Sequence, residues 1–316
     1  MLAVDHSRLA SAPASLAGRL DAVLPHLAPS LASDAARARL RRAASRAPAV
    51  SGFGFECRLG HPDRLDLAWR LTPGEQKGIA LRGLALPPPV AGTTVCVEID
   101  LPDSGGEGVG YFAGAGDAGR GRPSAGTAPH DVLALADWLG AGRLAPGARS
   151  FLSGRLAALP EHAWVGYVGR FAHRDADALR TSISGVRLGA VVAFLRDFGA
   201  PYRAVPQGLV ESLDGLAVRL VIALDVRDGF GETVGIELSP RHPGDWQWCL
   251  RRLAPFGFAE TCVPQLAAWP GLTRAAGETL ARRLNHVKLA CRAGQPTTTK
   301  AYFYIARTSA AECVAD

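Results

Sequence analysis

One lysine and two tyrosines alternate along a short segment near the end of the printed sequence. If PTTTKAYFYIA (296–306) forms an extended strand, Lys300, Tyr302 and Tyr304 lie on one of its faces, because successive side chains point to opposite sides. The other face is small or apolar. A solvated face would usually carry small polar groups, so a cation beside two phenols makes these residues candidates for a binding site.

Charged residues recur in the same alternating way on most of the other predicted strands. Nearly every strand has one apolar face and one polar face that carries charge. These polar faces hold Glu56, Arg58, Asp66, Arg70, Glu98, Asp100, Arg180, Arg219, Asp225, Glu237, His286 and Lys288, and Tyr167 adds a phenol. If the polar faces meet, they bring carboxylates, cations and phenols into one site.

The switch between helical and alternating periodicity predicts the elements that carry these residues. Ten strands are expected, at 52–59, 64–71, 77–86, 93–102, 163–172, 177–185, 216–226, 231–240, 285–293 and 297–306. Helices are expected at 16–27, 31–47, 130–140, 147–159, 187–198, 207–213, 245–253, 260–269 and 273–284. The glycine-rich stretch 103–129 is expected to form a long, flexible loop.

This order of elements predicts an α+β protein in which residues 1–316 form a single domain. Hairpins joined by helices give an antiparallel sheet, and a sheet of about ten strands tends to close because an open one leaves two edges. With helices against the apolar faces, the polar faces would line a solvent-filled chamber inside the barrel. The alternative is an open sheet with one wet face, on which the same charges are merely solvated.

Composition and charge limit the classes of ligand that the protein is expected to bind. The chain of 316 residues is 48% hydrophobic and carries a net charge of +6, which favours an anionic ligand. The arginines at positions 37, 39, 41 and 42 have no aromatic residues between them, so no nucleic-acid surface is predicted. No apolar run reaches the roughly 18 residues of a membrane span. We expect a cytoplasmic protein with reduced thiols.

Several other kinds of site lack the sequence signals that they need. The six cysteines form no CxxC pair, so structural zinc is not expected. GAGDAG (114–119) matches GxGxxG but stands in no strand–helix context, so no dinucleotide site is predicted. No cofactor is indicated with certainty, although Glu98, Asp100 and Glu237 could supply oxygen ligands for Mg²⁺.

Two hairpins carry a resemblance to a known family. SGFGFECRLGHPDRLDLAWRL (51–71) is similar to the first hairpin of the ABBA aromatic prenyltransferases, and HVKLACRAGQPTTTKAYFYIA (286–306) resembles the closing hairpin of its indole and cyanobactin-type members. The order of elements also resembles this family over most of the chain. The resemblance implies a barrel of about ten antiparallel strands, ringed by helices, that moves a prenyl group from its diphosphate to an aromatic small molecule or a peptide side chain.

The resemblance also implies roles for individual residues. Glu56 would be the base that takes the proton released by the acceptor. Cations would neutralise the departing diphosphate, and phenols would shield the allylic cation from water. The cations that hold the diphosphate would be Arg70, Arg219, Lys288 and Lys300, with Arg82 and Arg180 in reserve, and the shielding phenols would be Tyr302 and Tyr167.

Two alternatives to prenyl transfer stay open. The chain could be a non-catalytic barrel, or an accessory protein of peptide modification, that binds a hydrophobic or anionic ligand or a precursor peptide. It could also carry out phosphate-ester chemistry in the same chamber, which would require a metal and depend on Glu98 and Glu237.

Overall fold

The computed structural model describes residues 15–76, 93–102, 106–114, 129–139, 145–171, 178–275 and 277–308. Ten of its strands form the barrel: β1 (Gly52–Arg58), β2 (Leu65–Leu71), β3 (Thr94–Asp100), β4 (Gly108–Gly114), β5 (Trp164–Phe171), β6 (Leu179–Ser184), β7 (Val218–Val226), β8 (Phe230–Pro240), β10 (Glu278–Arg292) and β11 (Thr298–Thr308). Every neighbouring pair is antiparallel, and β11 pairs with both β10 and β1, which closes the sheet. The predicted closed barrel is confirmed, and the open sheet is excluded.

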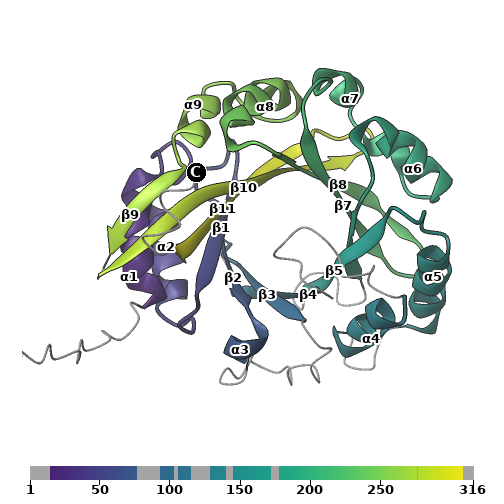
Figure 1. Ribbon diagram of the computed structural model, residues 1–316, viewed down its shortest axis with the longest axis horizontal. Coiled ribbons are helices and arrows are strands. Elements are labelled where there is room, and N and C mark those ends of the chain that lie inside the picture. Colours follow the sequence, from purple (N-terminus) through teal and green to yellow (C-terminus); the bar gives the residue numbers. More distant parts are fainter. Residues whose placement is uncertain are drawn as a thin grey trace, which may run out of the picture.

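Helices surround the barrel on its outer side (Figure 1). They are α1 (Leu16–Val23), α2 (Asp34–Ala44), α3 (Pro73–Gln76), α4 (Pro129–Leu139), α5 (Pro146–Ala157), α6 (Val191–Asp197), α7 (Leu209–Ser212), α8 (Trp246–Leu253) and α9 (Cys262–Ala267). Short 3₁₀ turns lie at Leu24–His26, Leu188–Ala190, Tyr202–Ala204, Pro243–Asp245 and Ala254–Phe256. None of the helices described is long and apolar enough to cross a membrane.

The hydrophobic core lies between these helices and the outer face of the barrel. Phe55 of β1 and Phe303 of β11 point outward, stack on each other, and meet the ring of Trp269, which follows α9. All three side chains are buried. The apolar side of each strand packs against the helices in this outer layer. The polar side of the same strand therefore faces the interior of the barrel.

The glycine-rich segment 103–129 is not wholly a loop, contrary to expectation. Residues 108–114 (GVGYFAG) form β4, between β3 and β5. Gly110 and Gly114 occupy interior positions, where added Cβ atoms would lie 2.6 Å from Phe171 and 2.7 Å from Tyr167 on the neighbouring strand. These glycines therefore make room for aromatic rings and do not mark a turn.

The helix expected at 273–284 is also wrong. This segment forms the end of β9 (Gly271–Ala275) and the start of β10, joined by a turn in which Gly277 has a positive φ of 81°. Its Ala, Glu, Arg and Leu residues favour a helix, but Leu280 and Leu284 are buried on one face of a strand that pairs with β11. Tertiary pairing overrides the local preference, and β9 adds an eleventh strand outside the closed barrel. The strand expected at 77–86 lies outside the described residues.

Candidate functional site

Strand register places the predicted site residues on neighbouring interior positions. Directly opposed residues of an antiparallel pair share a face of the sheet. Glu56 lies opposite Tyr302, Lys300 lies opposite Lys288, and Lys288 lies opposite Glu237. The four strands β1, β11, β10 and β8 therefore present one continuous interior surface, which we call the ionic wall (Glu56, Tyr302, Lys300, Lys288 and Glu237).

Glu56 and Lys300 form a buried ion pair at the centre of the ionic wall. The Nζ of Lys300 lies 2.5 Å from Oε1 of Glu56, and the carboxylate side chain is only 2% exposed. Burial opposes ionisation, but Lys300, Tyr302 and Lys288 together lower the pKa of Glu56 to about 2. Neither carboxylate oxygen has a described hydrogen-bond partner of good geometry. Glu56 is thus a buried carboxylate that stays charged because cations lie beside it.

Lys288 and Glu237 form a second buried ion pair beside the first. Lys288 donates to Oε1 of Glu237 over 2.8 Å, and Nε2 of His286 lies 3.8 Å from the other carboxylate oxygen. Burial disfavours the charged form of Glu237, yet Lys288 and His286 hold its pKa below the ordinary value. Burial lowers the pKa of His286. The imidazole stacks on the ring of Tyr302, with centroids 4.1 Å apart.

Arg180, a reserve candidate for the diphosphate, is engaged elsewhere. Its guanidinium donates two hydrogen bonds to Asp225 of β7, over 2.8 and 3.0 Å. Such a bidentate pair neutralises the arginine and fixes its direction. Arg180 also lies over the ring of Phe171, 5.3 Å from its centroid. Arg180 is therefore a paired cation of the barrel wall and not a free one.

Arg70 and Arg219 are the predicted cations that lack a carboxylate partner among the described residues. Arg70 donates to the hydroxyl of Thr94 over 3.3 Å, and its Nε is buried without a partner. Arg219 is exposed. Arg70 lies near the end of β2 and Arg219 near the start of β7, so both belong to the same end of the barrel. The charge of Arg70 reaches Tyr167 and Tyr304, where it offsets part of the rise in pKa that burial causes.

The opposite side of the interior is aromatic. Phe112 of β4 and Phe171 and Tyr167 of β5 lie across interior glycines on the neighbouring strands, and we call these three the aromatic wall. The two phenylalanine rings meet edge to face, with centroids 5.2 Å apart. In the strand order, β4 and β5 lie across the barrel from β10 and β11. The interior is thus divided between an ionic and an aromatic surface.

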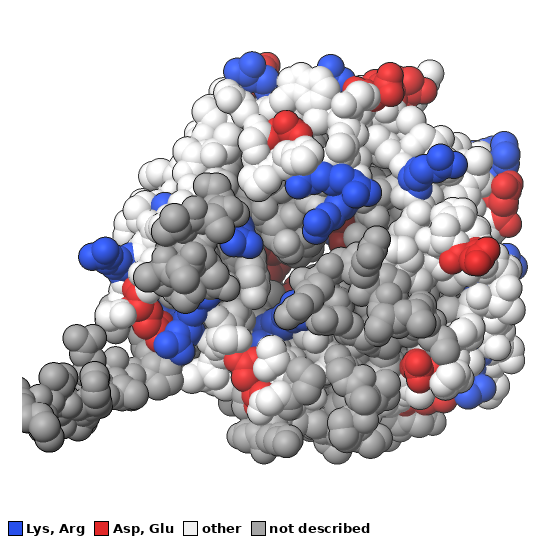
Figure 2. Space-filling view, viewed as in Figure 1, with Lys and Arg blue, Asp and Glu red and all other residues white. Residues whose placement is uncertain are grey.

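The view down the barrel shows a hollow at its centre, with Lys and Arg side chains near its rim and acidic side chains inside it (Figure 2). Asp66 of β2 lies opposite Glu56, and its carboxylate accepts a hydrogen bond from the backbone N–H of Leu101 over 2.8 Å. Burial and the charge of Glu56 raise the pKa of Asp66 to about 6. The interior face of the barrel therefore carries carboxylates of very different acidity.

The proposed magnesium ligands do not form a cluster. Among the residues that the structure describes, no group of three or more His, Cys, Asp and Glu side chains could hold a metal ion. Glu237 is committed to Lys288 and His286. The described cysteines, Cys57, Cys96, Cys249, Cys262 and Cys291, are free thiols.

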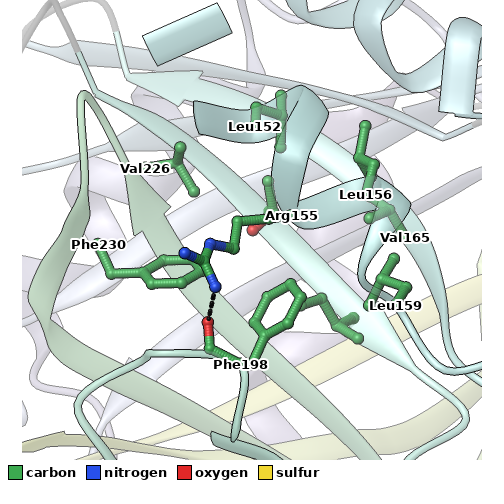
Figure 3. A pocket seen from close by; sticks show the side chains of 10 residues that line it. Leu152, Arg155, Leu156, Leu159, Val165, Phe198, Val226 and Phe230 are labelled. Atoms are coloured by element: carbon green, nitrogen blue, oxygen red, sulfur yellow. Dashed lines mark hydrogen bonds between the residues drawn. The ribbon is translucent and has the colours of Figure 1, made fainter. Parts of the chain in front are cut away.

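A second, apolar pocket lies outside the barrel between α5 and the strands (Figure 3). Leu152, Leu156, Phe198 and Phe230 line it, and Arg155 donates across it to the carbonyl of Phe198 over 2.9 Å. Its empty volume is about 220 Å³, open solvent included. This is below the roughly 300–1,000 Å³ of ordinary ligand pockets, so the space is a packing gap.

The structure brings together Glu56, Lys288, Lys300 and Tyr302, as the alternation predicted. Tyr167 and Arg70 lie on the same interior face, Arg219 is at one end, and Arg82 lies outside the described residues. Reasoning from sequence found Tyr167 of the aromatic wall but missed Phe171 and also Phe112, which fell in the presumed loop. The alternation in VGYFAG could have revealed it.

Comparison with known proteins finds likenesses among solved structures. No family model and no curated protein matches this chain. Among solved structures, the chain is similar to the crystal structure of 5-dimethylallyl tryptophan synthase from Streptomyces coelicolor in complex with DMASPP and Trp, with 13% identity and a TM-score of 0.49. The likeness covers 90% of this chain and 92% of that one. The strand pairing itself establishes the fold: the protein is a closed, ten-stranded antiparallel barrel ringed by helices, the architecture that its sequence resemblance implied.

Proposed function

We propose that this protein transfers a prenyl group, dimethylallyl or geranyl, from its diphosphate to an aromatic small molecule or a peptide side chain. The supporting observation is the division of the barrel interior. An ionic wall with a buried, ionised Glu56 faces an aromatic wall, and two cations without carboxylate partners among the described residues lie toward one end. A substrate with an anionic head and an apolar tail, together with an aromatic acceptor, matches this division.

In this proposal, Arg70 and Arg219 make the first contacts with the diphosphate. They lack carboxylate partners among the described residues, so binding an anion costs them no ion pair. Lys288 and Lys300 contribute if the diphosphate draws them away from Glu237 and Glu56. Tyr302 and Tyr167 line the space between the two walls and shield the allylic cation from water through their π faces.

The transfer step then balances as follows. The bond between the allylic carbon and the diphosphate oxygen breaks, and its electron pair leaves with the diphosphate. Electrons of the acceptor form the new bond to the allylic carbon, and the acceptor becomes positively charged. Its proton passes to the carboxylate of Glu56. A carboxylate with a pKa of about 2 suffices because the charged acceptor is itself a strong acid.

Binding and turnover test this proposal separately. Titration calorimetry with dimethylallyl diphosphate and geranyl diphosphate should give micromolar binding, and Arg70→Met should weaken it about tenfold or more, as expected for a lost charged hydrogen bond. Arg251→Met, on the exposed face of α8, is the matched control and should change nothing. Mass spectrometry after incubation with indole or a tyrosine-containing peptide, in the presence of EDTA, measures transfer. Failure of both diphosphates to bind, with no effect of Lys288→Ala or Lys300→Ala, would refute the proposal.

A binding protein without turnover is the second candidate, favoured by the neutralisation of both lysines. Such a barrel would bind a prenyl diphosphate or a precursor peptide but form no product. In that case neither the wild type nor Glu56→Gln would form product with any acceptor. A transferase instead loses product formation in Glu56→Gln while it retains diphosphate binding.

A further inference from the structure

The start of β10 pairs with β11 on one side and with β9 on the other, and we call the paired segments of β9 and β10 the ribbon. Within this ribbon Arg282 lies opposite Gly271 of β9 and opposite Ile305 of β11. Thr273 lies opposite Leu280, so Thr273 and Arg282 share one face of the ribbon. This is the outer side of the sheet, because Phe303 and Ile305 of β11 point the same way.

Arg282 is a buried arginine whose hydrogen-bond donors are not satisfied. Its side chain is 7% exposed, and both Nε and Nη1 are buried without a described partner. The hydroxyl of Thr273 and Nε1 of Trp269 are also buried and unpartnered. The guanidinium carbon lies 5.2 Å from the centre of the Trp269 ring. Four polar groups that can donate hydrogen bonds are therefore left unpartnered around one ribbon.

Arg19, the other buried arginine of this region, has a carboxylate partner, whereas Arg282 has none among the described residues. Arg19 of α1 is 2% exposed, and its guanidinium is paired with Glu278, at the start of β10. Arg307 contacts the same carboxylate over 3.2 Å, so Glu278 is already shared by two cations. Among the described residues, none pairs with Arg282. A largely buried charge without a counter-ion destabilises the folded state, so a counter-charge from outside the chain would stabilise this site.

Gly271 leaves the space in which the Arg282 guanidinium lies. An added Cβ at Gly271 would lie 2.8 Å from Nη2 of Arg282, so glycine leaves the space that the guanidinium occupies. His26, in the turn after α1, lies close enough that the charge of Arg282 adds to burial in lowering its pKa. The unpartnered groups are N–H donors and one hydroxyl, a set that suits an acceptor with negative charge and repels a cation.

We propose that Arg282, Thr273 and Trp269 bind a small inorganic anion of the halide or phosphate class on the outer side of the barrel. The anion accepts hydrogen bonds from the guanidinium and the hydroxyl, and it neutralises the buried charge. The site lies behind the ionic wall, because Trp269 packs on Phe55 and Phe303, the neighbours of Glu56 and Tyr302 in β1 and β11. It is independent of the proposed function, and neither proposal depends on the other.

Thermal unfolding at constant ionic strength tests the site. When potassium gluconate is replaced by chloride or by phosphate, the wild-type Tm should rise by about 2–4 °C and reach a plateau, as expected for a ligand that binds only the folded state. Arg282→Met should abolish the rise. Arg274→Met, an exposed arginine of β9, is its matched control and should retain it. A rise of equal size in Arg282→Met would overturn the proposal, because it would show a general salt effect.

Two further measurements keep the proposal testable if Arg282→Met fails to fold. Thr273→Val should raise the anion concentration at half-effect about tenfold, because one charged hydrogen bond is lost, whereas Thr279→Val in β10 should leave it unchanged. Crystals grown in bromide should show an anomalous scatterer beside the guanidinium of Arg282. An unaltered half-effect in Thr273→Val, or a site without bromide, would overturn the proposal and indicate that water alone fills the space.

Discussion

Gly110 offers a direct test of how the aromatic wall is built. In Gly110→Ala the new methyl carbon would lie 2.6 Å from Cδ1 and 2.7 Å from Cε1 of Phe171. Carbon atoms in contact prefer about 3.5–4.0 Å, so the ring must move by about 1 Å. That movement is hindered, because Phe112 contacts the ring from one side and Arg180, fixed by Asp225, lies over it.

The expected cost of this substitution follows from overpacking. A forced shift of a packed ring costs about 1–3 kcal/mol, and the reduced freedom of the unfolded chain on replacing glycine returns roughly 0.4–1 kcal/mol. Gly110→Ala should therefore lower the free energy of unfolding by about 1–2 kcal/mol in urea titrations. Gly106→Ala, for which an added Cβ meets nothing within 4 Å, is the control and should be neutral or slightly stabilising.

A double-mutant cycle identifies the ring as the cause. In a Phe171→Leu background the methyl group added at position 110 has more space. Gly110→Ala should therefore lower the free energy of unfolding by at least about 1 kcal/mol less than it does in the wild type, a coupling of the size found between contacting residues. Equal costs in both backgrounds, or a Gly110→Ala protein as stable as Gly106→Ala, would refute the reasoning that Gly110 exists to make room for Phe171.

The buried charges give three further predictions, each checked by urea unfolding. Glu56→Gln leaves Lys300 buried without a counter-ion and should cost about 3–5 kcal/mol, whereas Glu56→Gln with Lys300→Met should recover much of that loss; equal stability of the two would contradict the pairing. The pKa of Asp66 is raised to about 6, so its contribution to stability is complete below about pH 4 and declines as the pH rises through 6. Asp66→Asn keeps the acceptor for the Leu101 N–H but does not titrate. It should therefore remove up to about 3 kcal/mol of that decline between pH 4 and pH 8. Arg180→Lys cannot form the two-fold contact with Asp225 and should cost about 1–2 kcal/mol, an effect that should vanish in an Asp225→Asn background.

Alternation alone was enough to predict which residues face the interior. Glu56, Lys288, Lys300 and Tyr302 share a face because each stands an even number of residues from its neighbours on a strand whose other side is apolar. A burial pattern of period two shows which face of a strand points into the barrel. The side chains on that face are the ones that can contact each other in the interior. This inference holds wherever a strand is regular.

Bulges and composition defeated the same reasoning at the start of β10. Between Leu284 and His286 the register with β11 shifts by one residue. Before the bulge, the even-numbered Leu280 and Arg282 face outward, whereas after it the even-numbered His286 and Lys288 face the interior. No local signal marks that change, and the helix-favouring composition before it conceals the strand. Arg282 was therefore not recognised as a candidate site residue.

The sequence also could not show which carboxylate pairs with which lysine. Lys288 and Glu237 are 51 residues apart in sequence, and their pairing depends on the register between β8 and β10. Sequence alone could propose both lysines as free cations for a diphosphate, because it does not show that Glu56 and Glu237 lie beside them. The structure supplies that information, and it changes the expected order of events on binding.

If the two lysines were free, a diphosphate would bind deep in the barrel against two unneutralised charges. With both paired, each lysine can serve an anion only at the cost of exposing a buried carboxylate to a like charge. Arg70 and Arg219 face no such competition, so under the proposed function an entering anion would meet them first, at their end of the barrel. Loss of Arg70 should then slow association and weaken binding together, whereas Lys300→Met should chiefly affect the step after binding, because removing Lys300 also frees the carboxylate of Glu56 to accept a proton. A stopped-flow measurement that finds the reverse order, with Lys300→Met abolishing the first binding phase, would place the anion at the ionic wall from the start.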